Sequence, residues 1–245
     1  MKRYIWVLFI LLLSAPFPSS ARATVDHGLY AQLLKKHVVE PRVDYHGFKR
    51  DESLLDQYLD QLSAVRPASL SPNEAMAFYI NAYNAFTIKL ILTKYPDLNS
   101  IKELGSFFSS PWDKKFIPLG GHRVSLDHIE HDILRPRFKD PRVHFAINCA
   151  SKGCPPLRNT PYTGEELHRQ LEEQTIAFIN NPQQNFFKDG TLFISKIFKW
   201  FKEDFNHNPE AFVRQYARGE LKRTLDRAPG GSKLSYLPYD WSLNR

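Results

Sequence analysis

The sequence predicts an α+β protein, a helix-rich single domain around a buried central helix with a small antiparallel sheet. A helix predicted at 71–94 is apolar on nearly every side from Ala75 to Leu92, which is typical of a helix surrounded by protein. Short strand-like runs at 143–148 and 191–195 stand between helical patterns, so strands and helices are segregated.

The N-terminus has the features of an export signal. Lys2 and Arg3 precede an apolar run at residues 4–13, and Ala21-Arg22-Ala23 is a cleavage pattern. The apolar run is too short to span a bilayer. We therefore predict a signal peptide at 1–23 and one domain at 24–245 that is periplasmic or secreted. No stable membrane anchor is expected after cleavage.

Charge gives little support for a nucleic-acid partner. The predicted signal carries three basic and no acidic residues, so its removal lowers the formal charge from +7 to +4. The remaining basic residues are interleaved with acids instead of clustered, as on a solvated surface. We expect an unknown substrate or an envelope protein as partner.

The elements follow in order from hydrophobic spacing and cap residues. Ser71-Pro-Asn-Glu74 marks the start of the central helix with a cap, a proline and a glutamate. The remaining predictions are helices at 26–36, 51–65, 126–134, 164–180, 196–205 and 209–225, extended pieces at 43–47, 143–148 and 191–195, a long surface loop at 97–122 that could be a lid, and a docked aromatic tail at 233–244.

The central helix carries three polar side chains, at Asn81, Tyr83 and Asn84. Asn81 and Asn84 share a face because they are three residues apart. A buried amide needs a partner, so the two asparagines either fix loops through backbone groups or line a site. Both interpretations stay open.

A second polar group lies on the helix at 126–134. His128 and His131 are one turn apart, and Arg135 lies a further turn on, whereas Glu130 is expected to face away from His131. No third ligand accompanies the imidazoles at a recognisable spacing, so we expect no metal, and no cofactor is predicted. His131 is the better candidate base.

Cys149 and Cys154 are the only cysteines, and they lie in a Gly/Pro turn. In an oxidising compartment a nearby pair is most simply a disulfide. Alternatively, Cys149 is a nucleophile that a neighbouring imidazole activates. Strand alternation places His144 and Cys149 on opposite faces, which weakens His144 as that base.

These segments resemble the domain of unknown function 547 family, as in an exported bacterial member. The resemblance covers about Val43 to Phe205 and rests on the motifs at 78–88, 126–135, 144–157 and 198–205. It implies that recurring family positions fall on Asn81, Tyr83, Asn84, Glu130, His131 and Cys149. Plant members often have serine where Cys154 stands, which implies that a disulfide is not essential to the fold. The core is similar to papain-like and transglutaminase-like cores, although there the nucleophile begins the central helix.

Two functions follow as hypotheses. The first is a thiol-dependent hydrolase or acyl transferase acting on amide or peptide-like substrates. Its assigned catalytic residues are Cys149, His131, Asn81, Asn84 and Glu130, and its substrate-contacting residues are Tyr83, Arg135 and His144. The second is a non-catalytic envelope binding domain in which Cys149 and Cys154 form a structural disulfide. A zinc site that uses His128, His131 and a cysteine is a third possibility.

Overall fold

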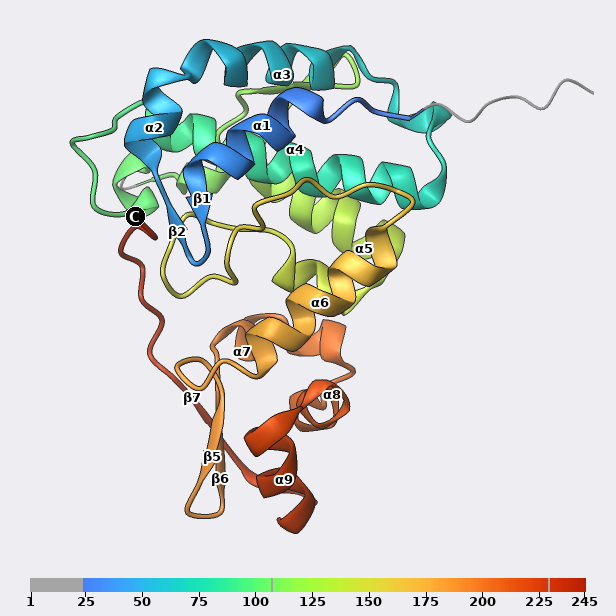
Figure 1. The fold of residues 1–245 in the computed structure, drawn as a ribbon, viewed down its shortest axis with the longest axis vertical. Helices are drawn as coiled ribbons and strands as arrows, with labels where there is room; N and C mark the ends of the chain where they lie inside the picture. The colour runs from blue at the N-terminus through green and yellow to red at the C-terminus, as the bar shows by residue number, and fades with distance from the viewer. Residues whose placement is uncertain (1–23, 107, 229) are drawn as a thin grey trace, which may run out of the picture.

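The computed structural model of the protein describes residues 24–106, 108–228 and 230–245 (Figure 1). Its elements form two adjoining parts, each with its own hydrophobic cluster. The first part surrounds helix α4, and the second contains α6 to α9 and a three-stranded sheet. The helix-rich α+β class is thereby confirmed. The predicted signal peptide, 1–23, lies outside the described residues.

Helix α4 (Pro72–Leu92) is the centre of the first part. The Ser71 hydroxyl accepts a hydrogen bond from the backbone N–H of Glu74 at 3.3 Å, as the sequence predicts for a cap. From Glu74 onward only Lys89 is not buried. The helix is long and apolar enough to cross a membrane, but 94% of that apolar stretch is buried inside the protein. It is therefore a core helix.

Shorter helical segments surround α4, and most of them bury apolar side chains in the same core. They are α1 (Gly28–His37), α2 (Tyr45–Arg50), α3 (Glu52–Ala64), η1 (Pro67–Ser69), η2 (Ile101–Leu104) and the π-helix η4 (His128–Leu134), which α5 (Arg135–Phe138) continues. In the layer formed by α1 and α3, Tyr30 stacks on Tyr58 with ring centroids 4.8 Å apart. The predicted helices at 26–36 and 51–65 are confirmed.

The second part combines helices with a mixed sheet. Its helices are α6 (Leu167–Ile179), α7 (Ile197–Trp200), η6 (Lys202–Phe205), α8 (Pro209–Tyr216) and α9 (Gly219–Arg227). Its strands are β5 (Phe186–Lys188), β6 (Thr191–Ile194) and β7 (Lys233–Tyr236). Strand β6 pairs antiparallel with β5 and parallel with β7. The parallel pair forms because the chain crosses α7 to α9 before it returns to the sheet.

The segment at 97–122 was predicted to be a long loop, but it contains regular structure. It contains η2 and η3 (Pro111–Asp113), and its end forms a hairpin of β3 (Ile117–Leu119) and β4 (His122–Val124). Gly120 and Gly121 both have positive φ, which a tight two-residue hairpin turn requires. Gly-Gly between two short extended runs is the signal that predicts this hairpin.

The strand predicted at 143–148 is wrong. Residues Pro141–Phe145 form the 3₁₀ helix η5, which begins because the Asp140 carboxylate accepts a hydrogen bond from the Arg142 backbone at 3.0 Å. Val143, His144 and Phe145 are all buried in succession, so this helical turn has no strand alternation. The argument that His144 and Cys149 lie on opposite strand faces therefore does not hold.

Three further boundaries differ from the predictions. The piece at 43–47 is extended only at its start, in the β1 (Val38–Val39) and β2 (Arg42–Val43) hairpin, because Asp44 caps α2. The helix at 196–205 divides into α7 and η6 at Phe201. The helix at 209–225 divides into α8 and α9, where Gly219 has a φ of 54°.

The C-terminal tail contacts the segment that holds the cysteines. From β7 it runs back to the first part of the molecule (Figure 1). The backbone N–H groups of Lys152 and Gly153 donate to the carbonyls of Ser242 and Asp240 at 2.9 Å each. The tail thus completes a surface formed about 90 residues earlier in the chain.

Candidate functional site

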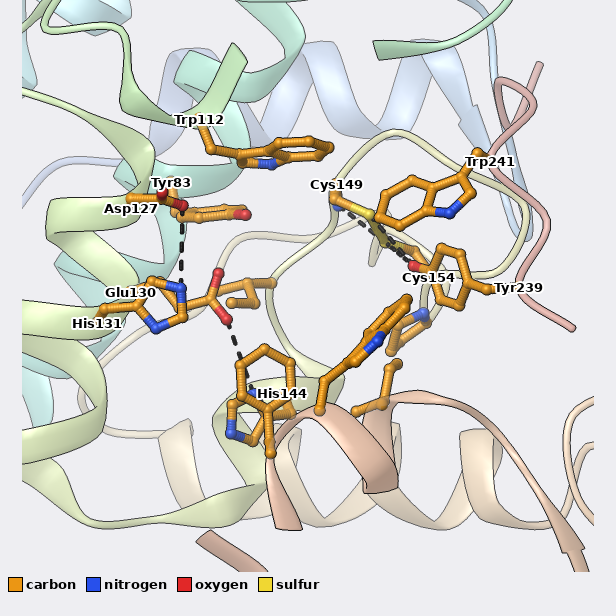
Figure 2. Close-up of a pocket in the computed structure, with 15 residues that line it drawn as sticks. Tyr83, Trp112, Asp127, Glu130, His131, His144, Cys149, Cys154, Tyr239 and Trp241 are labelled. Carbon is orange, nitrogen blue, oxygen red and sulfur yellow. Dashed lines mark hydrogen bonds and ion pairs between the residues drawn. A yellow bond between two sulfur atoms is a disulfide. The ribbon is translucent and has the colours of Figure 1, made fainter. Parts of the chain in front are cut away.

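A cavity of about 210 Å³ lies where the two parts of the molecule meet the C-terminal tail (Figure 2). Most of its lining is aromatic or ionisable, and the lining comes from segments distant in sequence. The lining residues are Tyr83, Trp112, Asp127, Glu130, His131, His144, Ile147, Cys149, Cys154, Pro155, Ile197, Trp200, Phe201, Tyr239 and Trp241. We call Asp127, Glu130, His131 and His144 the acid wall, and Cys149, Cys154, Tyr239 and Trp241 the sulfur wall.

The acid wall depends on the π-helix η4. Ser125 accepts a hydrogen bond from the His128 backbone at 3.1 Å, and the N–H of Arg135 bonds to the carbonyl of Glu130, five residues earlier. A π-helix has wider turns than an α-helix, so residues that an α-helix would separate lie together. Glu130 and His131 both line the pocket as a result. The prediction that Glu130 faces away from His131 was wrong because it assumed α-helical spacing.

The ionised form of Glu130 is unfavourable because its carboxyl group is buried. Its side chain is only 9% exposed, and burial, with a smaller effect of the negative charge on Asp127, raises its pKa to about 7. A hydrogen bond with the Tyr83 hydroxyl and the nearby Arg135 charge act in the opposite direction. Glu130 can therefore hold or release a proton near neutral pH.

Asp127 has a similar but weaker shift. Burial and a hydrogen bond with Asp113 raise its pKa to about 6. Its carboxylate lies 3.9 Å from Nε2 of His131. The pocket therefore has two carboxyl groups that titrate above their ordinary range.

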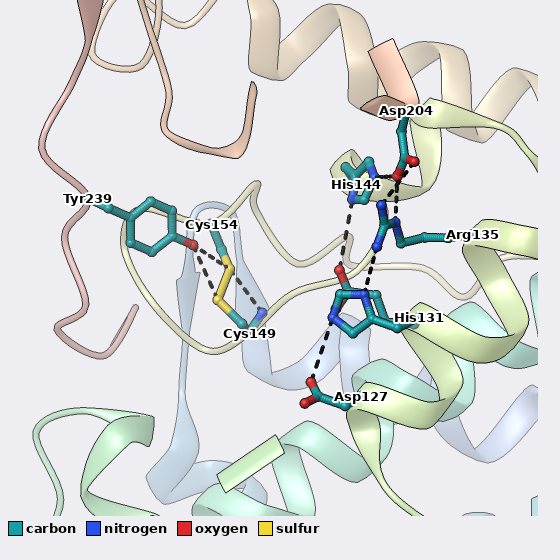
Figure 3. Close-up of polar contacts among 9 residues, drawn as sticks. Asp127, His131, Arg135, His144, Cys149, Cys154, Asp204 and Tyr239 are labelled. Carbon is teal, nitrogen blue, oxygen red and sulfur yellow. Dashed lines mark hydrogen bonds and ion pairs between the residues drawn. A yellow bond between two sulfur atoms is a disulfide. The ribbon is translucent and has the colours of Figure 1, made fainter. Parts of the chain in front are cut away.

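His144 is the most buried imidazole of the wall, with a side chain 1% exposed. Its Nε2–H donates to Asp204 at 2.7 Å (Figure 3), whereas Nδ1 has no hydrogen-bond partner among the residues that the structure describes. Nδ1 lies 3.9 Å from Glu130 Oε1. Burial lowers the pKa of His144, although the hydrogen bond to Asp204 raises it, so the ring is neutral with its lone pair on Nδ1.

Arg135 and Asp204 form the ion pair behind this imidazole (Figure 3). Arg135 donates to both carboxylate oxygens of Asp204, at 2.6 and 3.0 Å. Although burial opposes it, hydrogen bonds from His144 and Arg135 hold the pKa of Asp204 far below its ordinary value. Arg135 does not line the pocket, so the structure places this predicted substrate contact one layer behind it.

His131 lines the pocket, but its lone pair is occupied. Nδ1 accepts a hydrogen bond from Arg135 at 2.9 Å, and Nε2 is directed toward Asp127. Burial and the Arg135 charge lower the pKa of His131, so the ring is neutral. With Nδ1 engaged, His131 has a proton to donate and no free site to accept one.

Asn81 and Asn84 lie outside the pocket lining, and both hold backbone. Asn81 exchanges two hydrogen bonds with the backbone of Tyr162, at 2.7 and 2.9 Å. Asn84 donates to the carbonyl of Ala146 at 2.9 Å and accepts from the N–H of Asn148 at 2.8 Å. The structure therefore favours the interpretation in which the two amides fix loops, and Asn84 fixes the one that leads to Cys149.

Cys149 and Cys154 lie at disulfide distance and are joined in the sulfur wall (Figure 3). The backbone N–H of Cys149 donates to Cys154 Sγ at 3.0 Å, and the Tyr239 hydroxyl donates to the same sulfur at 3.1 Å. Cys149 Sγ lies 3.2 Å from the Ser151 hydroxyl and 3.3 Å from that of Tyr239. Within the described chain no imidazole is hydrogen-bonded to Cys149 in this disulfide form.

Asn148 fixes both ends of the loop 149–154. Its Oδ1 accepts from the N–H of Ala150 at 2.9 Å, and its Nδ2 donates to the carbonyl of Pro155 at 2.8 Å. Ala150 has a φ of 62°, which the closed loop imposes. The turn predicted around the cysteines is thus held at both ends by a buried side chain.

The zinc hypothesis receives no support from the arrangement of the histidines. His128 lies outside the pocket lining and pairs with Asp132 at 2.8 Å. In the described parts of the chain, no three histidine, cysteine, aspartate or glutamate side chains gather as metal ligands.

Several residues of the site were not predicted. Asp204 and Trp200 lie in the motif at 198–205 without an assigned role, and no sequence pattern assigns Asp127, Trp112, Tyr239 or Trp241 to the site. The aromatic content of 13% and the aromatic tail were the available signals. They indicate a packed or docked surface but do not say which cavity the rings line.

Residues 67–179 match the family described as Protein of unknown function, DUF547. The match includes α4, the π-helix and the cysteine loop, and it is narrower than the range of about 43–205 that the resemblance suggested. It includes the whole acid wall but not Asp204, Tyr239 or Trp241. No curated protein and no solved structure matches the chain.

Proposed function

We propose that the protein is an exported, thiol-dependent hydrolase or acyl transferase that acts on amide or peptide-like substrates in the periplasm or outside the cell. The observation that carries the proposal is the buried His144. Its orientation is fixed by Asp204, its buried Nδ1 has no hydrogen-bond partner among the described residues and lies 3.9 Å from Glu130 Oε1, and its ring lines the pocket that Cys149 also lines. An imidazole oriented by a carboxylate is the usual partner of a nucleophilic thiol.

In the proposed reaction Cys149 is the nucleophile in its reduced form. Its thiol proton passes to His144 Nδ1, and the thiolate attacks the substrate carbonyl carbon. The imidazolium then gives the proton to the departing amine, which leaves an acyl group on Cys149 that water or a second amine removes. The disulfide form is inactive, and reduction by a thiol frees both cysteines.

The proposal replaces His131 with His144 as the base. Nδ1 of His131 already accepts from Arg135, whereas Nδ1 of His144 has no partner among the described side chains. Glu130, with its pKa near 7, is suited to donate a proton to the carbonyl oxygen or the leaving group. Asn84 contributes by positioning the loop of Cys149, and Tyr83 by its hydrogen bond to Glu130.

The test uses activated acyl esters, thioesters and aminoacyl anilides as probes, with mass spectrometry of the protein. Cys154→Ser is expected to form an acyl adduct on Cys149 and to turn over without reductant. The unaltered chain should do so only after reduction, and Cys149→Ser in neither condition. Turnover by Cys149→Ser that equals that of the reduced protein would remove Cys149 from the mechanism.

Two histidine variants separate the candidate bases. In the Cys154→Ser background, His144→Gln is expected to lower the acylation rate by about 10² to 10³, the usual contribution of a general base. His131→Gln should cost less than about tenfold. The reverse order would restore His131 as the base.

The second candidate is a non-catalytic envelope binding domain with a structural disulfide. The contacts of the loop 149–154 with the C-terminal tail favour it, because they make the disulfide part of a docked interface. A thiol titration of the unfolded, unreduced protein separates the candidates in part. Two free thiols would exclude the structural disulfide.

A further inference from the structure

The pocket has an excess of acidic over basic side chains that the proposed acyl transfer does not require. Two carboxyl groups and two imidazoles line it, but among the described residues no lysine or arginine does. The nearest guanidinium, on Arg135, is held by both oxygens of Asp204. Glu130 is therefore a buried acid whose cationic neighbour is already paired with another carboxylate.

The remaining groups of the pocket do not supply the missing positive charge. Burial lowers the pKa of both His131 and His144, so both rings are neutral. Lys102 lies 3.9 Å from the ring centre of Trp241, but it is not a lining residue. Ionised carboxylates in a desolvated site favour a cation as ligand.

Aromatic rings form the largest part of the rest of the lining and suit the same ligand. Trp241 packs against Tyr239 with centroids 4.5 Å apart, and against Trp112 and Trp200 at 5.7 Å each. Tryptophan faces attract cations through the ring quadrupole and also cover apolar stems. The combination of carboxylates, tryptophans and neutral imidazoles selects a cationic head on a hydrocarbon stem.

We propose that this pocket binds a primary alkylammonium group, with the nitrogen at Asp127 and Glu130 and the stem against the tryptophan cluster. A primary amine fits better than a quaternary one because buried carboxylate oxygens accept N–H hydrogen bonds. A cavity of about 210 Å³ admits a short stem. The inference deepens the proposed function and, for the use of the amine in acyl transfer, rests on it.

The ammonium group would occupy the acid wall while the stem leads toward the sulfur wall. A substrate that carries an amine a few carbons from its carbonyl would then present the carbonyl to Cys149. Lysine-like and N-terminal amines belong to this substrate class.

Intrinsic fluorescence can measure binding without turnover. Trp112, Trp200 and Trp241 are all the tryptophans of the described chain and all line the pocket, whereas Trp6 lies in the predicted signal. The unreduced protein is titrated with n-pentylammonium, 1-pentanol and pentanoate, which differ in the head group. We expect saturable binding of pentylammonium, at least tenfold weaker binding of pentanol, and none of pentanoate.

Matched variants test the role of the carboxylates. Glu130→Gln should weaken pentylammonium binding about tenfold and leave pentanol unchanged, and Asp127→Asn should act in the same direction. Asp132→Asn removes an exposed acid of the same π-helix that does not line the pocket, and it should change the affinity less than twofold. Equal affinity for pentanol and pentylammonium, or tighter binding of pentanoate, would overturn the proposal.

Binding and catalysis can fail separately in this design. Selective ammonium binding without adduct formation on Cys149 would leave the amine site standing and reject the thiol enzyme. The protein could instead form adducts equally fast with neutral and amine-bearing acyl probes and show no preference for pentylammonium. That result would keep the thiol enzyme and reject the amine site.

Discussion

The acid wall and the sulfur wall of the pocket are held together by different interactions. The acid wall depends on side-chain pairs, and its central ion pair joins Arg135 to Asp204 across 69 residues. The sulfur wall depends on backbone hydrogen bonds between the loop 149–154 and a tail about 90 residues later. Single substitutions in the acid wall should therefore change its charge and its proton transfer. Single substitutions in the sulfur wall should change the shape of the pocket.

The largest effect is expected at Asp204, which orients His144 of the acid wall and pairs with Arg135 behind it. Asp204→Asn removes the charge that stabilises the His144 imidazolium and allows the ring to adopt the other tautomer. We expect the acylation rate of Cys149 to fall by about 10³. The tautomer of His144 is read independently by nitrogen NMR of the imidazole. It should change from the Nε2–H form of the parent protein.

A neighbouring acid provides the control for Asp204. Glu203→Gln removes an exposed charge from the same turn and should cost less than about threefold in rate. If Asp204→Asn had an equally small effect on the acylation rate, and His144 kept its tautomer, the acid wall would not take part in proton transfer from Cys149. The two walls would then differ only in the interactions that hold them together.

The second effect tests the buried charge of Glu130. Its folded-state pKa is raised from 4.5 to about 7, so the folded protein holds a proton that the unfolded chain releases. Stability is therefore fully present below pH 4.5 and is lost as the pH rises through 7. Glu130→Gln removes this loss. In urea unfolding it should gain about 2 kcal/mol relative to the parent between pH 5 and pH 8.

The control is Glu165→Gln, which replaces an exposed glutamate of the second part. Its stability difference from the parent is the baseline with which that of Glu130→Gln is compared. A flat difference for Glu130→Gln would mean that Tyr83 and Arg135 compensate the buried charge fully. The acid wall would then carry a stable anion and no proton near neutral pH.

The sequence predicted the acid wall better than the sulfur wall, for a physical reason. Glu130, His131 and His144 lie in short motifs, and their residue types alone indicate proton chemistry. Their orientation was not predictable because a π-helix and a 3₁₀ helix replaced the assumed helix and strand. Neither of these has a hydrophobic period distinct enough to recognise in so few residues.

The sulfur wall was predicted only at its cysteines. Tyr239 approaches both sulfurs from a tail that returns across the whole second part. Contacts of such long sequence separation leave no local pattern, so the aromatic tail could be predicted to dock but not where. The same holds for the central helix. Its burial was evident from composition, whereas the backbone partners of Asn81 and Asn84 were not.

The smallest effect is expected from a change of shape in the sulfur wall. A Cβ on Gly153 would lie 2.9 Å from the ring atoms of Tyr239, so Gly153→Ala must displace that ring. We expect a loss of about 1 kcal/mol in unfolding free energy. The disulfide should also be reduced faster by dithiothreitol, since the Tyr239 hydroxyl withdraws from both sulfurs.

Gly230→Ala is the matched control, because a Cβ there meets nothing within 4 Å. If Gly153→Ala left both the stability and the reduction rate at the values of the control, the tail would not press on the loop. Its tyrosine would then not govern access to Cys149, and the sulfur wall would be set by the disulfide loop alone.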